Sequence, residues 1–428
     1  MALNRIFIGF FSIAFVVGLL RSVLWWLQEQ FGLSIGLTMN ESDQLVFQTM
    51  MKASFDAAET AVSIVIYLIG IMTLWLGIMR IGEKAGAVEK LSKAVAPFFE
   101  KLFPDIPKNH PATGNIMMNF AANMLGLDNA ATPSGLKAMK DLQELNTEKD
   151  TASNSMIMFL VLNTSGLTII PVSVLALRAA AGSENPTDVF IPILLATYCA
   201  SIGGIIWVAL KQKIKLVDTT ILKYLGGITG FIALFMYLML SLAPAEMEST
   251  ATFMSNFILF AIIIAFIWMG LKKQINIYDS FIEGAKEGFD TTIKIIPYLV
   301  GMLVAIAVFR ASGTLGFITD SIQYGVIALG MNAEFVDALP TAFMKPLSGS
   351  GARAMMVETM DTFGPDSFAG YLSSVFQGST ETTFYTLAVY YGYVNISKTR
   401  YTATAGLFAD FIGIIAAIGI AYLFYTSH

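Results

Sequence analysis

Seven long apolar segments are the feature that most constrains how this chain can fold. They cover residues 6–20, 61–79, 190–210, 225–242, 253–271, 295–309 and 404–424. Each is long enough, as a helix, to cross a hydrocarbon core about 30 Å thick. Lipid offers no hydrogen bonds to the backbone, so such segments must satisfy their own N–H and C=O groups. The sequence therefore predicts an all-α polytopic membrane protein surrounded by a lipid bilayer.

Composition and charge agree with this class and exclude several others. The chain is 55% hydrophobic and 13% charged, whereas soluble domains carry about 25% charged residues. Its net charge of −5 argues against a nucleic-acid partner. Cys199 is the single cysteine, and His110 and His428 are the only histidines. Neither a disulfide, a His/Cys metal centre nor a cofactor is therefore expected, although carboxylates and carbonyls could still form an ion site.

The first apolar segment has two interpretations. Residues 6–20 follow Arg5 and could form a signal peptide. No small-residue cleavage site follows, however, because Arg21 and bulky residues come next. We therefore expect a retained first helix or a signal anchor.

An internal repeat organises most of the chain. Residues 54–210 and 280–425 share one order of features: an apolar helix, a glycine-containing loop, a polar run and a final apolar helix. We divide the chain into an N-terminal membrane helix with an external segment, a first repeat, two connecting membrane helices and a second repeat, at residues 1–53, 54–215, 216–273 and 274–428.

The charges between these helices predict opposite orientations for the two repeats. Lysines follow both the first and the last helix of the first repeat, which marks those ends as cytoplasmic. The loop 182–188 is acidic, whereas the corresponding loop 397–400 is basic. We therefore predict inverted-topology repeats, as in many secondary transporters. The alternative is a parallel duplication, because Arg310, Lys345 and Arg353 do not fit the charge pattern.

One segment of the first repeat is amphipathic. Residues 81–103 place apolar residues at helical spacing between lysines, with Pro97 inside. This pattern predicts a helix that lies along the membrane surface. Residues 281–289 are expected to be its shorter counterpart in the second repeat.

Each repeat also contains apolar segments that are too short to cross a membrane. Residues 116–125 lead into a loop with Pro133 and Gly135, and residues 339–344 lead into Pro346 and two glycines. Short segments interrupted by Gly and Pro at matched positions predict broken or re-entrant helices around a midplane binding site. Such breaks free backbone groups that need protein partners or a ligand.

The polar side chains at these breaks are the candidate substrate contacts. They are Asn123, Asp128, Asn129, Thr132, Asn163, Thr164, Ser165, Ser348, Ser350, Arg353, Gln377, Ser379, Thr380, Glu381 and Thr382. Alternatively, they satisfy the broken helix ends without any ligand. Asp128 in particular could be a helix N-cap, given the proline that follows it.

Two acids in the second repeat are candidates for ion coupling. An ionisable group at membrane depth is functional by default, and Glu381 and Asp410 both lie in apolar surroundings. Glu381 is expected to bind solute, Na⁺ or H⁺; alternatively, it pairs with Arg353. Asp410 could instead sit near the interface as a structural acid. The first repeat has Leu167 and Ser201 or Ala200 at the aligned positions, so ion coupling should depend on the second repeat.

The loops and polar runs resemble those of a known family. Residues 62–82, 125–139, 159–178 and 191–196 look like spore maturation protein A, with G-L-D-N-A-A-T-P-S-G-L-K-A-M at 126–139. Spore maturation protein B is similar to residues 295–313, 339–354, 364–367, 377–391 and 400–413, with P-L-S-G-S-G-A-R at 346–353. The chain thus resembles a fusion of the two.

This resemblance implies two nucleoside recognition, or Gate, domains, similar to segments of concentrative nucleoside transporters and of bacterial ferrous iron permeases. The nucleoside transporters bind nucleoside through a Gln-Thr-Glu run in a re-entrant hairpin. Gln377, Thr380 and Glu381 are similar to that run, with Gly378 and Ser379 inserted. The family is associated with dehydration of the spore core. The resemblance also implies a multi-pass protein of the bacterial inner (cytoplasmic) membrane and, because Gate-type transporters often assemble, a homodimer or homotrimer.

Two classes of function follow for the two-repeat architecture. The first is a transporter-like protein that moves or binds a small polar solute, such as a nucleoside or related metabolite, between the repeats, with Na⁺ or H⁺ as coupling ion. The second is a non-transporting scaffold or sensor in spore maturation or envelope physiology. An enzyme is not expected, because no Walker A, GxSxG or zinc-binding spacing is present.

Overall fold

The computed structural model describes residues 2–32 and 39–425. Within these residues, seven helices are long and apolar enough to cross a membrane, and each contains all or most of one of the apolar segments singled out in the sequence. They are α1 (Ala2–Phe31), α3 (Val46–Lys84), α9 (Phe190–Gln212), α10 (Thr219–Leu240), α11 (Pro244–Lys272), α12 (Ile277–Ala311) and α18 (Thr402–Phe424). No strand occurs among the described residues beyond one isolated bridge, between Thr151 and Lys398. The prediction of an all-α polytopic membrane protein is confirmed.

Shorter helices lie between the long ones. They are α2 (Glu41–Gln44), α4 (Ala87–Leu102), α5 (Pro111–Met124), α6 (Asp128–Leu145), α7 (Asn154–Ser165), α8 (Val172–Ala180), α13 (Thr314–Ala328), η1 (Glu334–Ala338), α14 (Leu339–Met344), α15 (Gly349–Phe363), α16 (Phe368–Ser379) and α17 (Thr383–Tyr393). Both α7 and α16 have 12 residues and are therefore about 18 Å long. Each covers only part of a hydrocarbon core about 30 Å thick.

The helices occur in two series with the same order. The first series runs from α3 to α9 and the second from α12 to α18; each has a long helix, a short one, four further short α-helices and an apolar helix, and the second also contains the 3-10 helix η1. The first turn in each series is made by a glycine in the left-handed region, Gly86 at φ +85° and Gly313 at φ +86°. The counterpart of α4 is therefore α13. The expectation that residues 281–289 fill this role is wrong, because they belong to the continuous helix α12.

The amphipathic helix α4 begins later than the sequence pattern suggests, because α3 continues to Lys84. Its buried face presents Phe98, Phe99 and Leu102 to the bundle, while Lys90 and Lys93 are exposed. This division of apolar and basic side chains is typical of a helix that lies along a membrane surface.

Corresponding helices of the two series pack antiparallel. A Cβ at Gly284 would lie 2.3 Å from the carbonyl oxygen of Leu76, and one at Gly288 would lie 2.6 Å from that of Met72. The sequence number thus rises along α12 as it falls along α3. Glycine removes the side chain at these contacts, so the two backbones approach closely. Helices α9 and α18 also run antiparallel, with Gly413 of α18 against Ala200 and Gly203 of α9 against Ile412.

The loops at the two ends of the bundle pair in the same crossed way. Between α6 and α7, Asp150 forms an ion pair of 2.8 Å with Lys398, which lies between α17 and α18. At the opposite loops, Arg178 of α8 donates to the carbonyl oxygen of Pro365, between α15 and α16. A parallel duplication would bring equivalent loops to the same end. The crossed pairing is the arrangement that inverted repeats predict.

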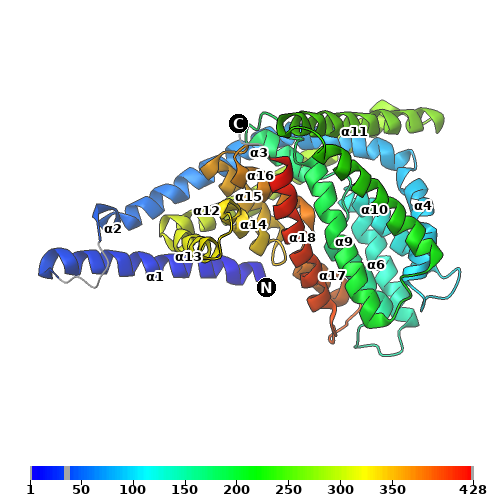
Figure 1. Ribbon diagram of the computed structural model, residues 1–428, viewed down its shortest axis with the longest axis horizontal. Coiled ribbons are helices and arrows are strands. Elements are labelled where there is room, and N and C mark those ends of the chain that lie inside the picture. Colours follow the sequence, from blue (N-terminus) through cyan, green and yellow to red (C-terminus); the bar gives the residue numbers. More distant parts are fainter. Residues whose placement is uncertain (1, 33–38, 426–428) are drawn as a thin grey trace.

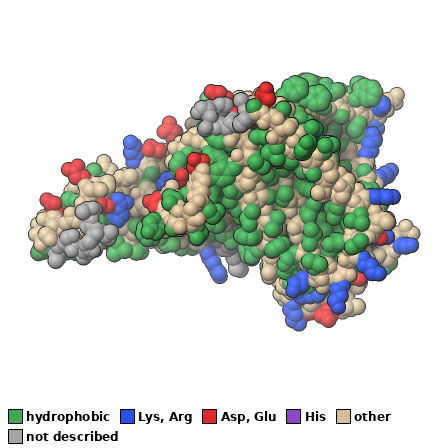
Figure 2. Space-filling model, in the orientation of Figure 1, with side chains coloured by type: hydrophobic (Ala, Val, Ile, Leu, Met, Phe, Trp, Pro, Cys, Tyr) green, Lys and Arg blue, Asp and Glu red, His purple; other side chains and the backbone are tan. Residues whose placement is uncertain are grey.

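An arm and a bundle make up the molecule (Figure 1). The arm at the left contains α1, α2, the first part of α3 and α13, while α9 and α18 lie side by side in the bundle. Helix α3 has 39 residues and is about 58 Å long, so it extends well beyond a hydrocarbon core of about 30 Å. Lys and Arg side chains gather at the right and lower right of the molecule, and the face between the ends is largely hydrophobic (Figure 2).

Candidate functional site

Four helix breaks meet inside the bundle. The breaks separate α5 from α6, α7 from α8, α14 from α15, and α16 from α17. In the first series, the amide of Ile169 donates to the carbonyl oxygen of Met124 at 2.7 Å; in the second, the amide of Phe384 donates to that of Pro346 at 3.0 Å. Backbone groups freed by one break are thus satisfied by another, as a membrane interior requires.

A third hydrogen bond joins the two series through their polar runs. The amide of Glu381 donates to the carbonyl oxygen of Thr164 at 2.8 Å. Gly166 makes this contact possible, since its φ is +52° and a Cβ there would lie 2.7 Å from Cγ of Glu381. The structure therefore brings together the polar runs of residues 163–168 and 377–383.

A cavity of about 230 Å³ lies beside this contact. The helix breaks contribute Asn123, Gly126, Gly166, Thr168 and Glu381 to its wall. The long helices α3 and α12 contribute the polar side chains of Arg80, Glu83, Glu287 and Thr291, and α8 contributes Ser173. This cavity joins residues of both series and has a size close to the lower end of small-molecule sites, about 300 Å³.

Asn123, which lines the cavity, is ordered by hydrogen bonds to other asparagines. Nδ2 of Asn123 donates to Oδ1 of Asn163 at 3.0 Å, and Nδ2 of Asn163 donates to the carbonyl oxygen of Phe159 at 2.9 Å. Nδ2 of Asn123 also donates to Oδ1 of Asn119 at 3.5 Å, so both of its amide donors are engaged. Asn123 can therefore present its carbonyl oxygen to a ligand in the cavity.

Several of the sequence-predicted contacts close the helix breaks instead of facing the cavity. Thr164 and Ser165 donate to the carbonyl oxygens of Val161 and Leu162 within α7. Ser348 is the N-cap of α15 and accepts a hydrogen bond from the amide of Gly351, and Ser379 donates to the carbonyl oxygen of Phe376. Their hydroxyls have the capping geometry expected for broken helix ends.

The other predicted contacts that the structure describes lie in two different environments. Gln377, Thr380 and Thr382 are buried near the breaks, and Oε1 of Gln377 has no hydrogen-bond partner among the described residues. Thr132 is exposed on α6. The side chains of Asp128 and Asn129 lie outside the described residues, and the N-cap of α6 is Leu127, so the alternative of Asp128 as N-cap is wrong.

Arg353 lies in a second cavity of about 40 Å³, together with Ser350. Leu68, Met72, Leu177 and Leu299 give this cavity a mainly apolar wall. The alternative ion pair between Glu381 and Arg353 is not formed in the described part of the chain, and Nε of Arg353 is buried without a hydrogen-bond partner there. Arg353 therefore faces an apolar space instead of an acid.

Asp410 is buried against the breaks of the second series. It is 2% exposed, and its Oδ2 accepts a hydrogen bond of 2.6 Å from the hydroxyl of Thr383. Lys345, which is 5% exposed, and Glu381 lie within electrostatic range of this carboxylate. Its bond to Thr383 is compatible with either a coupling or a structural acid, and Oδ1 has no hydrogen-bond partner among the described residues.

The cavity also contains charged residues that the sequence pattern assigned to membrane flanks. Arg80 forms ion pairs with Glu83 at 2.7 Å and with Glu283 of α12, and Lys84 also pairs with Glu283. These residues lie at helix ends, where charge normally marks a membrane surface. The spacing of three between Arg80 and Glu83 was the available signal, because it places both on one helix face.

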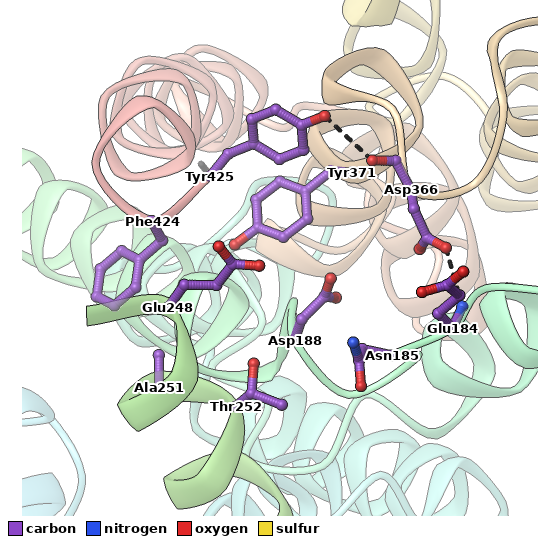
Figure 3. A pocket seen from close by; sticks show the side chains of 10 residues that line it. All are labelled: Glu184, Asn185, Asp188, Glu248, Ala251, Thr252, Asp366, Tyr371, Phe424 and Tyr425. Atoms are coloured by element: carbon purple, nitrogen blue, oxygen red, sulfur yellow. Dashed lines mark hydrogen bonds between the residues drawn. The ribbon is translucent and has the colours of Figure 1, made fainter. Parts of the chain in front are cut away.

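A second polar cluster, which the sequence did not reveal, closes the opposite end of the bundle. Arg178 is fully buried and donates to the carbonyl oxygen of Pro365 at 2.8 Å, to Asp366 at 3.0 Å and to Asp188 at 3.2 Å. Figure 3 shows Asp188, Glu248 and the hydroxyl of Tyr371 directed toward the same small space. Burial raises the pKa of Asp188 to about 6, against the opposing effect of Arg178. The cluster ties α8 to the start of α16.

Comparisons with known proteins agree with the resemblance in the sequence. The Gate family model, described as nucleoside recognition, matches residues 65–181. Spore maturation protein A of Bacillus subtilis (strain 168) is 46% identical over 159 residues, which are 37% of this chain and 81% of that protein. Spore maturation protein B of the same organism is 48% identical over 166 residues, which are 39% of this chain and 92% of that protein.

Proposed function

Because this chain belongs to the family of spore maturation proteins A and B and combines both in one polypeptide, we propose that it transports a small polar solute through a site between its two helix series. The observation that carries this proposal is the meeting of the polar runs at the cavity. Glu381 of one series is hydrogen-bonded through its amide to Thr164 of the other and lines a 230 Å³ space. Relative movement of the series would change this space directly.

The arrangement supports alternating access. The long helices α3 and α12 line one side of the cavity and the helix breaks line the other. Secondary transporters built from inverted repeats bind their substrates where discontinuous helices meet near the midplane. The charges predict that the ends of α3 and α9 are cytoplasmic, and we propose the bacterial cytoplasmic membrane as the location. A nucleoside is one candidate solute, from the description of the Gate model.

Asp410 and Glu381 are the proposed coupling residues. Asp410 is buried beside Thr383 with one carboxylate oxygen unpartnered among the described residues, so it could exchange a proton or contribute to a Na⁺ site. Both acids belong to the second series. Coupling through them would make the two halves of the transporter functionally unequal. The proposed transport requires no covalent chemistry.

The proposal is tested with the purified full chain in proteoliposomes. Uptake is measured for nucleosides, nucleobases, small carboxylates and amino acids, with Na⁺ and proton gradients imposed in either direction. Saturable uptake of one class, abolished by Glu381→Gln, is expected. If no class of solute is taken up or bound, the transport proposal is wrong.

A scaffold or sensor is the second candidate. It is favoured by the use of the Thr164, Ser165, Ser348 and Ser379 side chains to satisfy helix breaks. Ligand binding without uptake in the proteoliposome experiment would identify a sensor, and a chain that binds no solute would leave the scaffold role.

A further inference from the structure

The two cavities beside the helix breaks adjoin each other. Met72 of α3 and Ser173 of α8 line both of them. Glu381 faces the larger cavity and Arg353 lines the smaller one. A solute that filled both would therefore pass between two fixed charges of opposite sign.

The smaller cavity has the chemistry of a carboxylate subsite. Its wall is apolar except for Arg353 and the hydroxyl groups of Ser173, Ser350 and Tyr298. No described residue forms an ion pair with Arg353, and its Nε is buried without a partner among them. A guanidinium in apolar surroundings is stabilised by an anion that accepts its parallel N–H donors. A ligand carboxylate supplies this geometry.

Charge and volume favour a single carboxylate over a larger anion. One guanidinium neutralises one negative charge, and a dianion in this apolar space would keep an uncompensated charge. The cavity volume of about 40 Å³ compares with about 30 Å³ for a water molecule in the liquid. It therefore admits a group of a few atoms.

The larger cavity has the opposite character. Its described charged side chains are those of Glu83, Glu287, Glu381 and Arg80. Arg80 pairs with Glu83 and Glu283, and Glu287 has a partner of its own, so the negative charge available to a ligand is that of Glu381. Asn123 adds a carbonyl oxygen as acceptor, since its Nδ2 donates to Asn163. Hydrogen-bond acceptors and negative charge together suit an ammonium group with its three N–H donors.

We propose that the solute is a zwitterion of amino-acid type, with its carboxylate at Arg353 and its ammonium group at Glu381. The proposal rests on the transport function proposed above and specifies the substrate class for the same site. The apolar side chains that line the smaller cavity, including Met72 and Leu299, would contact the aliphatic side chain of the solute. Neither charge would then remain uncompensated in the occupied site.

The test measures ligand-induced thermal stabilisation and counterflow uptake with the full chain. The probes are glycine, leucine and the dipeptide glycyl-leucine, with leucinamide, N-acetylleucine and uridine as matched alternatives. We expect a zwitterion to bind, and expect that blocking either charged end weakens binding at least tenfold. Arg353→Gln should bind leucine and leucinamide with similar affinity. Glu381→Gln should bind leucine and N-acetylleucine with similar affinity. Arg353→Lys should restore part of the carboxylate selectivity.

The controls separate this assignment from loss of fold and from loss of transport. Arg5→Gln removes an exposed arginine of α1 that lines neither cavity, and should bind like the parent. Uridine binding without zwitterion binding would overturn the zwitterion and leave the transport function standing. Equal binding of leucine, leucinamide and N-acetylleucine would also overturn it. If no probe of any class binds or is transported, the proposed function itself fails.

Discussion

The carboxylate of Glu381 reaches the cavity from a helix break, which couples its position to the backbone of both series. Its amide is held by Thr164 while its side chain lines the cavity. Glu381→Gln keeps the shape and the amide contact but removes the negative charge. We expect solute affinity to fall at least tenfold, about 1.4 kcal/mol, with ion-driven uptake lost and thermal stability nearly unchanged.

Binding and melting temperature, measured on the same detergent-solubilised sample, check this expectation. Glu100→Gln is the matched control, because Glu100 is exposed on α4 and lines neither cavity. Unchanged coupling in Glu381→Gln would take this residue out of the mechanism.

Asp188 makes a pH-dependent contribution to the stability of the folded protein, and its sign is unusual for an acid. Burial raises its pKa from 3.8 to about 6, while Arg178 lowers it and Asp366 and Glu248 raise it further. The folded state therefore binds a proton more tightly than the unfolded state. This contribution to stability is complete below about pH 4 and is lost as pH rises through about 6.

We expect Asp188→Asn to flatten the fall of melting temperature between pH 4.5 and 6.5. The measurement is intrinsic fluorescence on heating, at closely spaced pH values. Asp105→Asn, an exposed aspartate between α4 and α5, should keep the parent profile. An identical pH profile in Asp188→Asn and the parent would contradict the assignment.

Among the candidate site residues, the sequence could select those that stand out from their neighbours in the chain. Glu381 and Asp410 could be selected because an acid within an apolar segment is conspicuous without any knowledge of the fold. Arg80 and Glu287 could not, because charge near a helix end is ordinarily a membrane-surface signal and only the packing of α3 on α12 brings them to the cavity. Arg178 was missed for the same reason: its partners Asp188 and Asp366 come from different helix series.

The helix elements show a similar division between local and long-range information. Gly and Pro predict where a helix breaks, and Gly126 and Pro346 lie at the breaks before α6 and α15. The expected loop at Pro133 and Gly135 is wrong, because both residues lie inside α6. Which breaks touch is set by contacts between distant segments, such as Glu381 with Thr164, and the sequence placed both polar runs in one site only through the repeat. Residues 281–289 were predicted to form a separate surface helix because of their charged side chains. They belong instead to the continuous helix α12.

Gly166→Ala tests the contact between helix breaks. The alanine Cβ would lie 2.7 Å from Cγ of Glu381, and the alanine backbone would have to adopt the φ of +52° that Gly166 has. The left-handed conformation alone costs about 1–2 kcal/mol, and the contact adds to it by displacing Glu381. We expect a lower melting temperature together with weaker solute binding.

Gly182→Ala is the matched control for the backbone cost. Gly182 also has a positive φ, +83°, but no atom lies within 4 Å of a Cβ placed there. It should lose stability without losing affinity. If both variants behave alike, the contact between the breaks does not position Glu381.

At the scale of the whole molecule, the two ends of the bundle should face opposite sides of the membrane. In a Cys199→Ser background, single cysteines replace the exposed residues Glu184, Glu246, Glu148 and Lys213. We expect a membrane-impermeant maleimide to label positions 184 and 246 in intact cells, and positions 148 and 213 only after permeabilisation. Labelling of 148 and 184 from the same side would contradict the inverted arrangement.

The bond between Glu381 and Thr164 has a consequence for stoichiometry. Here the A-like and B-like sequences are linked in one chain, with α10 and α11 between the two series, so each molecule contains equal numbers of both. Their contact forms at an effective concentration set by the tether instead of by abundance. Where related A and B proteins are made as separate chains, the same contact would have to form between two polypeptides, and the scarcer one would limit the number of complete sites.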